Sequence, residues 1–500
     1  MEANDSPEMP RGVLERIAPR WPLLVIAFLV FPLSAAYALK IHAPADDAYI
    51  YLVYVKNLLE GRGLTFNGTV VEGFSSVAWM FLLSASGLLR IPGLSLPLLG
   101  QLLGFASGLL ALFTTRHLAR RVGLEERWAL LAVALLAATG DFAFYMSSGL
   151  EAALFVALVP LCVARLYDDD LAATLRSGSF PLLMAVTILV RPEGALVCGL
   201  VLLCALVATR SLWLPVRCGL SLSAMLAPVL VAKRLHFGFW LPNTYYVKSN
   251  AGLANLAQGI DYLEKSLARY DVLLVAIALG VALALWRRRG LPSRLAPLAF
   301  VTAIWLVHVM VQGGDNLVGG RTLIPVLPLV YVALVWVAGE LAFPAASVAT
   351  ALLCVGLVAH YLGDEDVARQ TGSWRKGAEV YRAAGEILRE RFPPDTLVAL
   401  NPAGMIPFYS GLPTIDMLGL NDVHIAHHGK RDPMMRFAHQ VGDGAYVLSR
   451  EPGVILFGGF LKREASPYFV SDRQIWASPQ FQRSYASVEW PGVGWAWVRK

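Results

Sequence analysis

"WPLLVIAFLVFPLSAAYALKIHAPADD" (residues 21–47) sets an apolar run directly before two adjacent acids. About 20 apolar residues are enough for a helix to cross the hydrocarbon core of a bilayer. The run is too long for the core of a signal peptide, and no clean small-residue cleavage site precedes the acids, so we expect a retained membrane anchor. Asp46 and Asp47 would then lie where this anchor ends, at the edge of the bilayer.

The rest of the chain continues this apolar pattern. Of its 500 residues 56% are hydrophobic and only 16% are charged, whereas a soluble domain is about one-quarter charged. We therefore expect a polytopic α-helical membrane protein with about eleven transmembrane helices, or up to 13 if long runs are divided. The expected spans are 22–41, 74–90, 95–116, 128–146, 149–167, 180–209, 216–235, 271–286, 296–312, 322–341 and 344–362.

The distribution of basic residues predicts the orientation of the spans. We expect the protein in the inner membrane of the cell. Arginines precede the first apolar run, so the N-terminus is expected in the cytoplasm. The loop "RRRGLPSR" (287–294) then also lies inside, and eleven spans leave the C-terminus outside. The basic stretch 116–127 falls outside under this count, against the rule. Two alternatives stay open: 74–90 is not a full span, or 180–209 is two helices broken at "RPEG".

The net charge of +6 and the five cysteines exclude some functions. Basic loops that fix membrane orientation account for the charge, and no stacking aromatic array accompanies them, so we expect no nucleic-acid partner. All cysteines lie within apolar runs and none forms a CxxC pair, so we expect neither disulfides nor a cysteine metal site.

The composition becomes polar after about residue 363. Apolar residues at helical spacing predict a helix over 373–392, and the stretches 396–401, 445–449 and 453–459 are typical of short buried strands. We therefore divide the chain into a transmembrane domain (1–362) and a soluble, extracytoplasmic α/β domain (363–500).

The first outer loop, 42–73, begins with the acid pair and ends near Glu72. The stretch that starts at Asp46 predicts a short helix on the outer surface, followed by a glycine-rich turn. Acids at the start of a helix commonly just complement its dipole and cap its free N–H groups. The alternative is that Asp46 and Asp47 handle a proton or a divalent cation, Mg, Mn or Ca, at the bilayer edge; no cofactor is otherwise indicated.

Three further outer loops carry polar residues suited to a sugar bound beside a phosphate. Acids and glycines are also ordinary turn residues, and a basic residue at the end of a span often serves only as an anchor, so both interpretations stay open. The candidates are Trp240, Asn243, Tyr245, Tyr246 and Lys248 in loop 237–252, Asp315 and Arg321 in loop 312–321, and Asp416 and Asp422 in loop 413–422.

A charged side chain inside an apolar run costs free energy unless it is paired, so we expect each one to have a partner. We expect Arg191 and Glu193 to pair with each other or to end a helix, with support of a nearby lipid-phosphate site as the competing hypothesis. Glu151 is expected to cap its span, and His308 is interpreted as a core histidine.

Taken together and in order, these motifs resemble GT-C glycosyltransferases that use polyprenyl-phosphate sugars. They are most similar to the terminal β-(1→2)-arabinofuranosyltransferase family of mycobacterial cell-wall synthesis. The resemblance runs from residue 46 to about 428. The motifs that carry it are "DDAYI" (46–50), "GRGLTFN" (61–67), "VEGFSS" (71–76), "SGLE" (148–151), "RPEG" (191–194), "PNTYYVK" (242–248), "GGDNLVGGR" (313–321) and "DMLGLND" (416–422).

The resemblance implies catalysis by the acidic motif of the first outer loop and a lipid-phosphate sugar donor. A hydroxyl acceptor needs a base near its proton, which either Asp46 or Asp47 could supply. The sugar, a pentose such as arabinofuranose or another, stays open, as does the acceptor, which is an envelope glycan, lipid or protein. The alternatives from other classes are a transporter or flippase of lipid-linked sugars and a non-catalytic envelope-assembly protein.

Overall fold

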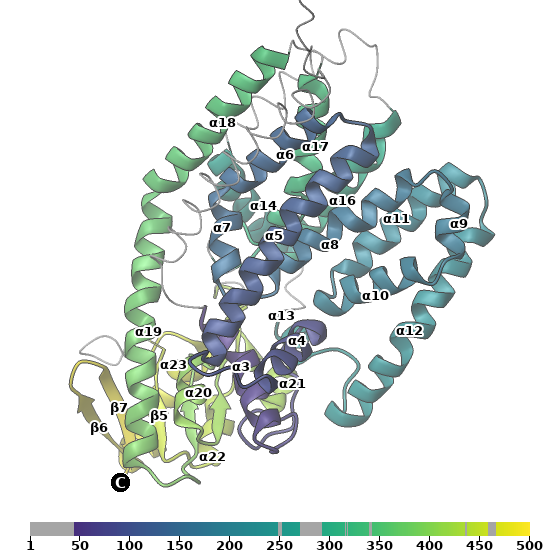
Figure 1. Ribbon diagram of the computed structural model, residues 1–500. Coiled ribbons are helices and arrows are strands. Elements are labelled where there is room, and N and C mark those ends of the chain that lie inside the picture. The colour runs from purple at the N-terminus through teal and green to yellow at the C-terminus, as the bar shows by residue number, and fades with distance from the viewer. Residues whose placement is uncertain are drawn as a thin grey trace, which may run out of the picture.

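The computed structural model describes residues 45–248, 253–270, 293–315, 317, 319–339, 343–435, 438–458 and 467–500. Apolar helices form one part of the molecule, and a small sheet with short helices forms the other (Figure 1). α18 (Phe343–Gly363) and α19 (Glu365–Arg391) follow each other along one side and lead from the first part into the second (Figure 1). The predicted spans 22–41 and 271–286 lie outside the described residues.

The apolar part follows the predicted runs. Its other helices are α4 (Val77–Leu88), α5 (Leu96–Val122), α6 (Glu126–Ala138), α7 (Gly140–Ser147), α8 (Ala152–Ala164), α10 (Ser179–Val190), α11 (Gly194–Thr209), α12 (Trp213–Phe237), α16 (Ala296–Gln312) and α17 (Leu327–Ala338). In the described part of the chain four helices, α5, α12, α16 with its preceding turn, and α18, are long and apolar enough to cross a membrane. α6 and α7 form a fifth candidate that is bent by 65°.

The predicted run 180–209 is two helices. α10 ends at Val190, Arg191 has an extended backbone with φ −148° and ψ 131°, and α11 begins at Gly194. Because Pro192 follows Arg191, the α-helical region is disfavoured at that residue. This break is one of the two changes to the span count that would help to place the basic stretch 116–127 inside.

α5 approaches α7 closely at Gly104. A Cβ atom there would lie 2.1 Å from the carbonyl oxygen of Met146, so only glycine fits. Small residues at such crossings let helix backbones meet inside membrane bundles.

The loop predicted to be the first outer one contains α3 (Asp46–Leu59). The expectation of a helix on the outer surface is wrong in one respect, because residues 48–55 are all buried. The C-terminal domain covers this helix: Lys56 Nζ donates to the carbonyl of Phe408 at 3.0 Å, and the Asn67 amide donates to the carbonyls of Pro407 and Leu412 at 3.1 and 3.0 Å. The loop is therefore held between the two parts of the molecule.

The C-terminal part is built around a five-stranded sheet of order β2-β1-β5-β7-β6. β1 pairs parallel with β2 and β5, whereas β7 pairs antiparallel with β5 and β6. The strands are β1 (Val398–Leu400), β2 (Thr414–Asp416), β5 (Val454–Leu456), β6 (Tyr485–Trp490) and β7 (Gly494–Arg499), with the pair β3 (Lys430–Arg431) and β4 (Val441–Gly442) beside them. The short helices are α20 (Met405–Ser410), α21 (Val423–His428), α22 (Gly444–Ser449), α23 (Val470–Trp476) and α24 (Pro479–Ser484).

The predictions for this domain are mostly confirmed. The helix predicted over 373–392 corresponds to the C-terminal part of α19, which ends at Arg391, and β1 and β5 lie within two of the predicted strands. The predicted strand 445–449 is wrong, because this segment is α22. The Asp443 side chain accepts a hydrogen bond from Tyr446 N at 3.0 Å and so caps the start of that helix.

Candidate functional site

Two cavities meet beside the start of α3. The larger one, about 610 Å³, lies between α3, the 191–193 break, the end of α16 and the residues Gly314, Asp315, Arg321 and Thr322 that follow it. The smaller one, about 380 Å³, lies between α3, α19 and the C-terminal domain. Asp47 and Lys248 border both cavities. A group bound in one cavity would therefore meet a group bound in the other at these two residues.

The two adjacent acids have different surroundings. The Asp46 carboxylate accepts hydrogen bonds from Gly404 N at 3.1 Å and Met405 N at 2.8 Å, so it closes the start of α20. A Cβ atom on Gly404 would lie 1.9 Å from the Asp46 carbonyl oxygen, which leaves no room for another residue. Loss of hydration raises the pKa of Asp46 to about 7, with a further contribution from the charge of Asp47.

Asp47 has a free carboxylate. Within the described residues it makes no hydrogen bond and no ion pair, and it faces the junction of the two cavities. The sequence left a helix-capping role open for both acids. In the structure only Asp46 of the two has this role, and the helix that it caps is α20 of the C-terminal domain. Asp47 is the acid placed to exchange a proton with a ligand.

Lys248 is the second free charge at this junction. It ends α13 (Asn243–Lys248), and burial of its ammonium group lowers its pKa. In the part of the chain that the structure describes, Lys248 forms no ion pair, although the charges of Asp315 and Asp47 partly oppose the lowering of its pKa. A cation without a partner beside an apolar bundle is suited to an anionic group of a ligand.

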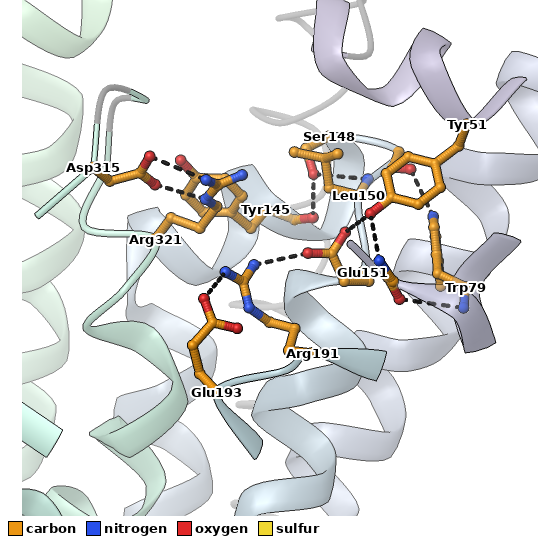
Figure 2. A network of polar contacts seen from close by, with 12 residues as sticks. Tyr51, Trp79, Tyr145, Ser148, Leu150, Glu151, Arg191, Glu193, Asp315 and Arg321 are labelled. Carbon is orange, nitrogen blue, oxygen red and sulfur yellow. Dashed lines mark hydrogen bonds and ion pairs between the residues drawn. The ribbon is translucent and has the colours of Figure 1, made fainter. Parts of the chain in front are cut away.

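Two arginines in the wall of the larger cavity are held by acids (Figure 2). Arg321 donates from Nε to Asp315 Oδ2 at 2.6 Å and from Nη2 to Asp315 Oδ1 at 3.0 Å. Arg191 donates to Glu151 at 2.7 Å and to Glu193 at 2.9 Å. These pairs fix the planes of both guanidinium groups while leaving them at the cavity wall.

The predicted pairing of Arg191 with Glu193 is confirmed, but the predicted capping role of Glu151 is wrong. Glu151 stands at the N-cap position of α8 without a side-chain capping bond, because its carboxylate bridges Arg191 and the hydroxyl of Tyr51. Figure 2 shows this bridge, which ties α3 to the broken helix pair.

Four other predicted residues are engaged elsewhere and border neither of these two cavities. Glu72 pairs with Lys233 at 2.7 Å, and the Asn243 amide donates to the carbonyl of Gly419 at 3.2 Å. Burial raises the pKa of Asp416 to about 6, and its carboxylate holds the following turn. Asp422 caps α21 through Ile425 N at 2.9 Å.

The three predicted aromatic residues also differ in whether they border a cavity. Tyr245 lines the larger cavity, whereas the Tyr246 ring packs against His427 with 4.2 Å between ring centroids. Trp240 is 57% exposed and borders neither cavity. Only Tyr245 of the three is therefore placed to contact a ligand in the larger cavity.

Sequence reasoning missed several lining residues. His308, interpreted as a core histidine, and Asn255 line the larger cavity, and Trp374 and Asn401 line the smaller one. Each is a single residue within an ordinary helix or strand end, so no motif marked it. In the described residues no group of three or more His, Cys, Asp or Glu is arranged to hold a metal ion, and both Asp46 oxygens already accept backbone hydrogen bonds.

Comparison with known proteins shows similarity over both parts of the chain. A family model described as a domain of unknown function (DUF8728) matches residues 368–497. The terminal β-(1→2)-arabinofuranosyltransferase of Mycobacterium tuberculosis (strain ATCC 25618 / H37Rv) is 32% identical over 380 residues. This match covers 67% of the chain and 55% of the relative, so the chain spans about half the length of that protein.

Solved structures show the fold. ArnT from Cupriavidus metallidurans, bound to undecaprenyl phosphate, matches with a TM-score of 0.56 at 15% identity, over 80% of this chain and 86% of ArnT. The oligosaccharyltransferase AglB from Archaeoglobus fulgidus, in complex with an inhibitory peptide and a dolichol-phosphate, matches with a TM-score of 0.51 at 11% identity, over 97% and 75%. The predicted fold class, a polytopic helical GT-C protein with a C-terminal α/β domain, is confirmed.

Proposed function

We propose that this chain, which has the GT-C fold and is related in sequence to a terminal arabinofuranosyltransferase, is a membrane glycosyltransferase. It would transfer a sugar, with a pentose such as arabinofuranose as the first candidate, from a polyprenyl-phosphate donor to a hydroxyl group of an envelope glycan. One observation carries the proposal: a free acid, Asp47, and a free cation, Lys248, border both of two adjoining cavities.

The larger cavity is the proposed donor site. Its lining combines the charged groups described above with the apolar side chains of Leu196, Leu241 and Val311. A lipid phosphate reaches this depth with its tail still in the bilayer, and its charge needs a cation. Lys248 is the first candidate contact because its ammonium group has no competing acid at ion-pair distance in the described residues, whereas Arg321 is already bound to Asp315.

The smaller cavity is the proposed acceptor site. Aromatic side chains of Trp374, Tyr381 and Phe469 and the amide of Asn401 line it. Asn401 Oδ1 is buried and has no hydrogen-bond partner within the described residues, so it is available to an acceptor hydroxyl. Aromatic faces with amide groups suit a sugar chain better than a lipid acceptor, which would need a long apolar channel.

Asp47 is the proposed general base. As the acceptor oxygen attacks the anomeric carbon of the donor, its proton passes to the Asp47 carboxylate. The bond between that carbon and the phosphate oxygen breaks, and the polyprenyl phosphate leaves with the electron pair. Lys248 would then stabilise the negative charge that develops on the departing phosphate.

The domain division belongs to this proposal. Residues 1–362 would form the transmembrane catalytic domain and 363–500 the extracytoplasmic domain, in the inner membrane and with the N-terminus in the cytoplasm. The contact between Asp46 and the start of α20 supports this arrangement, because it requires the acid pair and the C-terminal domain on the same side of the membrane.

Incubation of the purified protein with a short-chain polyprenyl-phosphate pentose and an oligosaccharide acceptor tests the function. Release of polyprenyl phosphate together with a lengthened oligosaccharide is the expected result. Movement of the intact lipid-linked sugar across proteoliposomes, with no release, would instead identify a transporter. Binding of the oligosaccharide alone would identify an assembly protein.

A further inference from the structure

Three buried polar atoms in the wall of the larger cavity have no hydrogen-bond partner within the described residues. They are Glu193 Oε2, Asn255 Oδ1 and His308 Nε2. Buried polar atoms in proteins are almost always paired, because an unsatisfied one costs free energy. Three such atoms on residues that line one cavity are groups to which a bound ligand can supply the missing partners.

The chemistry of these atoms restricts the ligand. A carboxylate oxygen and an amide oxygen only accept hydrogen bonds, and the histidine nitrogen accepts or donates according to its tautomer. An ionised phosphate has no proton to donate, and a prenyl chain has no polar group. A ring that carries several hydroxyl groups provides donors for both oxygens and a partner for the imidazole.

The three side chains come from separate elements. Glu193 precedes α11, Asn255 belongs to α14 (Leu253–Leu267), and His308 lies in the last turns of α16. Glu193 is held in place because its other oxygen, Oε1, accepts from Arg191 at 2.9 Å. The Asn255 residue is 7% exposed, so its position is also fixed by its surroundings. A wall assembled in this way can distinguish hydroxyl positions on a ring.

We propose that Glu193, Asn255 and His308 form the subsite for the sugar ring of the donor and determine which sugar is accepted. This inference rests on the proposed function, since it divides the larger cavity into a phosphate end at Lys248 and a sugar end at these three residues. It goes beyond the motif residues, because Asn255 and His308 belong to none of the motifs.

Paired ligands test the subsite. The dissociation constants of a short-chain polyprenyl phosphate and of the same lipid carrying a pentose are measured for the full-length protein in nanodiscs. In Glu193→Gln the position of Oε2 is taken by an amide NH₂ group, which donates, or by an uncharged oxygen. Binding of the sugar-bearing lipid should therefore weaken roughly ten- to a hundredfold. Asn255→Ala and His308→Phe should weaken it roughly two- to tenfold. All three should bind the bare polyprenyl phosphate as the wild type does.

Gln258→Ala is the matched control, because Gln258 lies one turn after Asn255 on the same helix and does not border the cavity. If the variants bind both ligands as tightly as the wild type does, the subsite is refuted while the proposed function stands. If the wild type binds neither ligand, the proposed function itself fails. Should Glu193→Gln not fold, Asn255→Ala decides the question, together with His308→Phe, which also removes the hydrogen bond between the His308 and Gln312 side chains.

Discussion

Asp46 and Asp47 should respond differently to the same substitution by asparagine. Asp47 makes no hydrogen bond or ion pair within the described residues, so Asp47→Asn removes its charge and its ability to take a proton without breaking a described contact. General-base catalysis contributes about 10²–10⁴-fold to a rate, so turnover should fall by that factor. The midpoint of thermal unfolding should stay at its wild-type value.

Asp46→Asn should act mainly on stability. The asparagine side chain has one acceptor oxygen, so it keeps one of the two hydrogen bonds from Gly404 N and Met405 N and turns its own N–H₂ group towards the other. Above the raised pKa of about 7 Asp46 is ionised, and loss of a hydrogen bond to a charged group there costs roughly 1.5–3 kcal/mol. The unfolding midpoint should therefore fall by a few degrees, while turnover at saturating acceptor falls less than in Asp47→Asn.

The assay follows release of polyprenyl phosphate at saturating substrates, alongside thermal unfolding of each variant in detergent. Asp169→Asn is the matched control, since this acid is exposed in the turn before α9 (Leu171–Arg176). If Asp47→Asn retains wild-type turnover and Asp46→Asn loses it at an unchanged unfolding midpoint, the roles assigned to the two acids are reversed and the reasoning is refuted.

Four further outcomes are expected. Lys248→Ala should weaken binding of a short-chain polyprenyl phosphate roughly ten- to over a hundredfold by calorimetry, since the ammonium has no competing ion pair in the described residues; unchanged affinity would make Lys248 a membrane anchor. Arg191→Ala leaves the Glu151 side chain, 3% exposed, without its cation, so unfolding should become easier by about 3–5 kcal/mol, and adding Glu151→Gln should recover much of this. The pKa of Asp46 is raised from 3.8 to about 7, so the folded protein keeps the Asp46 proton to a higher pH than the unfolded chain does. The contribution of Asp46 to stability is therefore full at low pH and declines as the pH rises from about 4 to about 7. The unfolding midpoint of Asp46→Asn should lack this pH dependence. In spheroplasts an impermeant thiol reagent should label Ser487→Cys in exposed β6 and not Ser293→Cys, and the opposite pattern would invert the topology.

Much of the fold could be predicted because its determinants are long and repeated. Apolar runs give the helices of the bundle, and the break at "RPEG" follows from one proline. The strand predicted at 445–449 failed because an apolar run this short fits a strand or a buried helix, and the capping residue Asp443 decided between them.

The candidate site was predictable only in part. Asp47, Lys248, Asp315 and Arg321 line the larger cavity as expected of a ligand site. Asp416 and Asp422 are also polar residues in a motif, yet they hold turns and helix starts, and sequence does not separate these two uses of an acid. The difference between Asp46 and Asp47 depends on Gly404, more than 350 residues away in the chain. Such a contact exists only once the C-terminal domain has docked.

The meeting of the two cavities at one acid has an evolutionary consequence. The proposed donor cavity is lined by the apolar helices and their loops, whereas most of the proposed acceptor cavity is lined by α19 and the C-terminal domain. Under the proposed function, substitutions in the C-terminal domain would change which glycan is extended without altering recognition of the lipid carrier. If the chain is the glycosyltransferase proposed here, descendants of one ancestor would diversify their acceptors while using the same lipid-linked sugar, provided that Gly404, which faces Asp46, is kept.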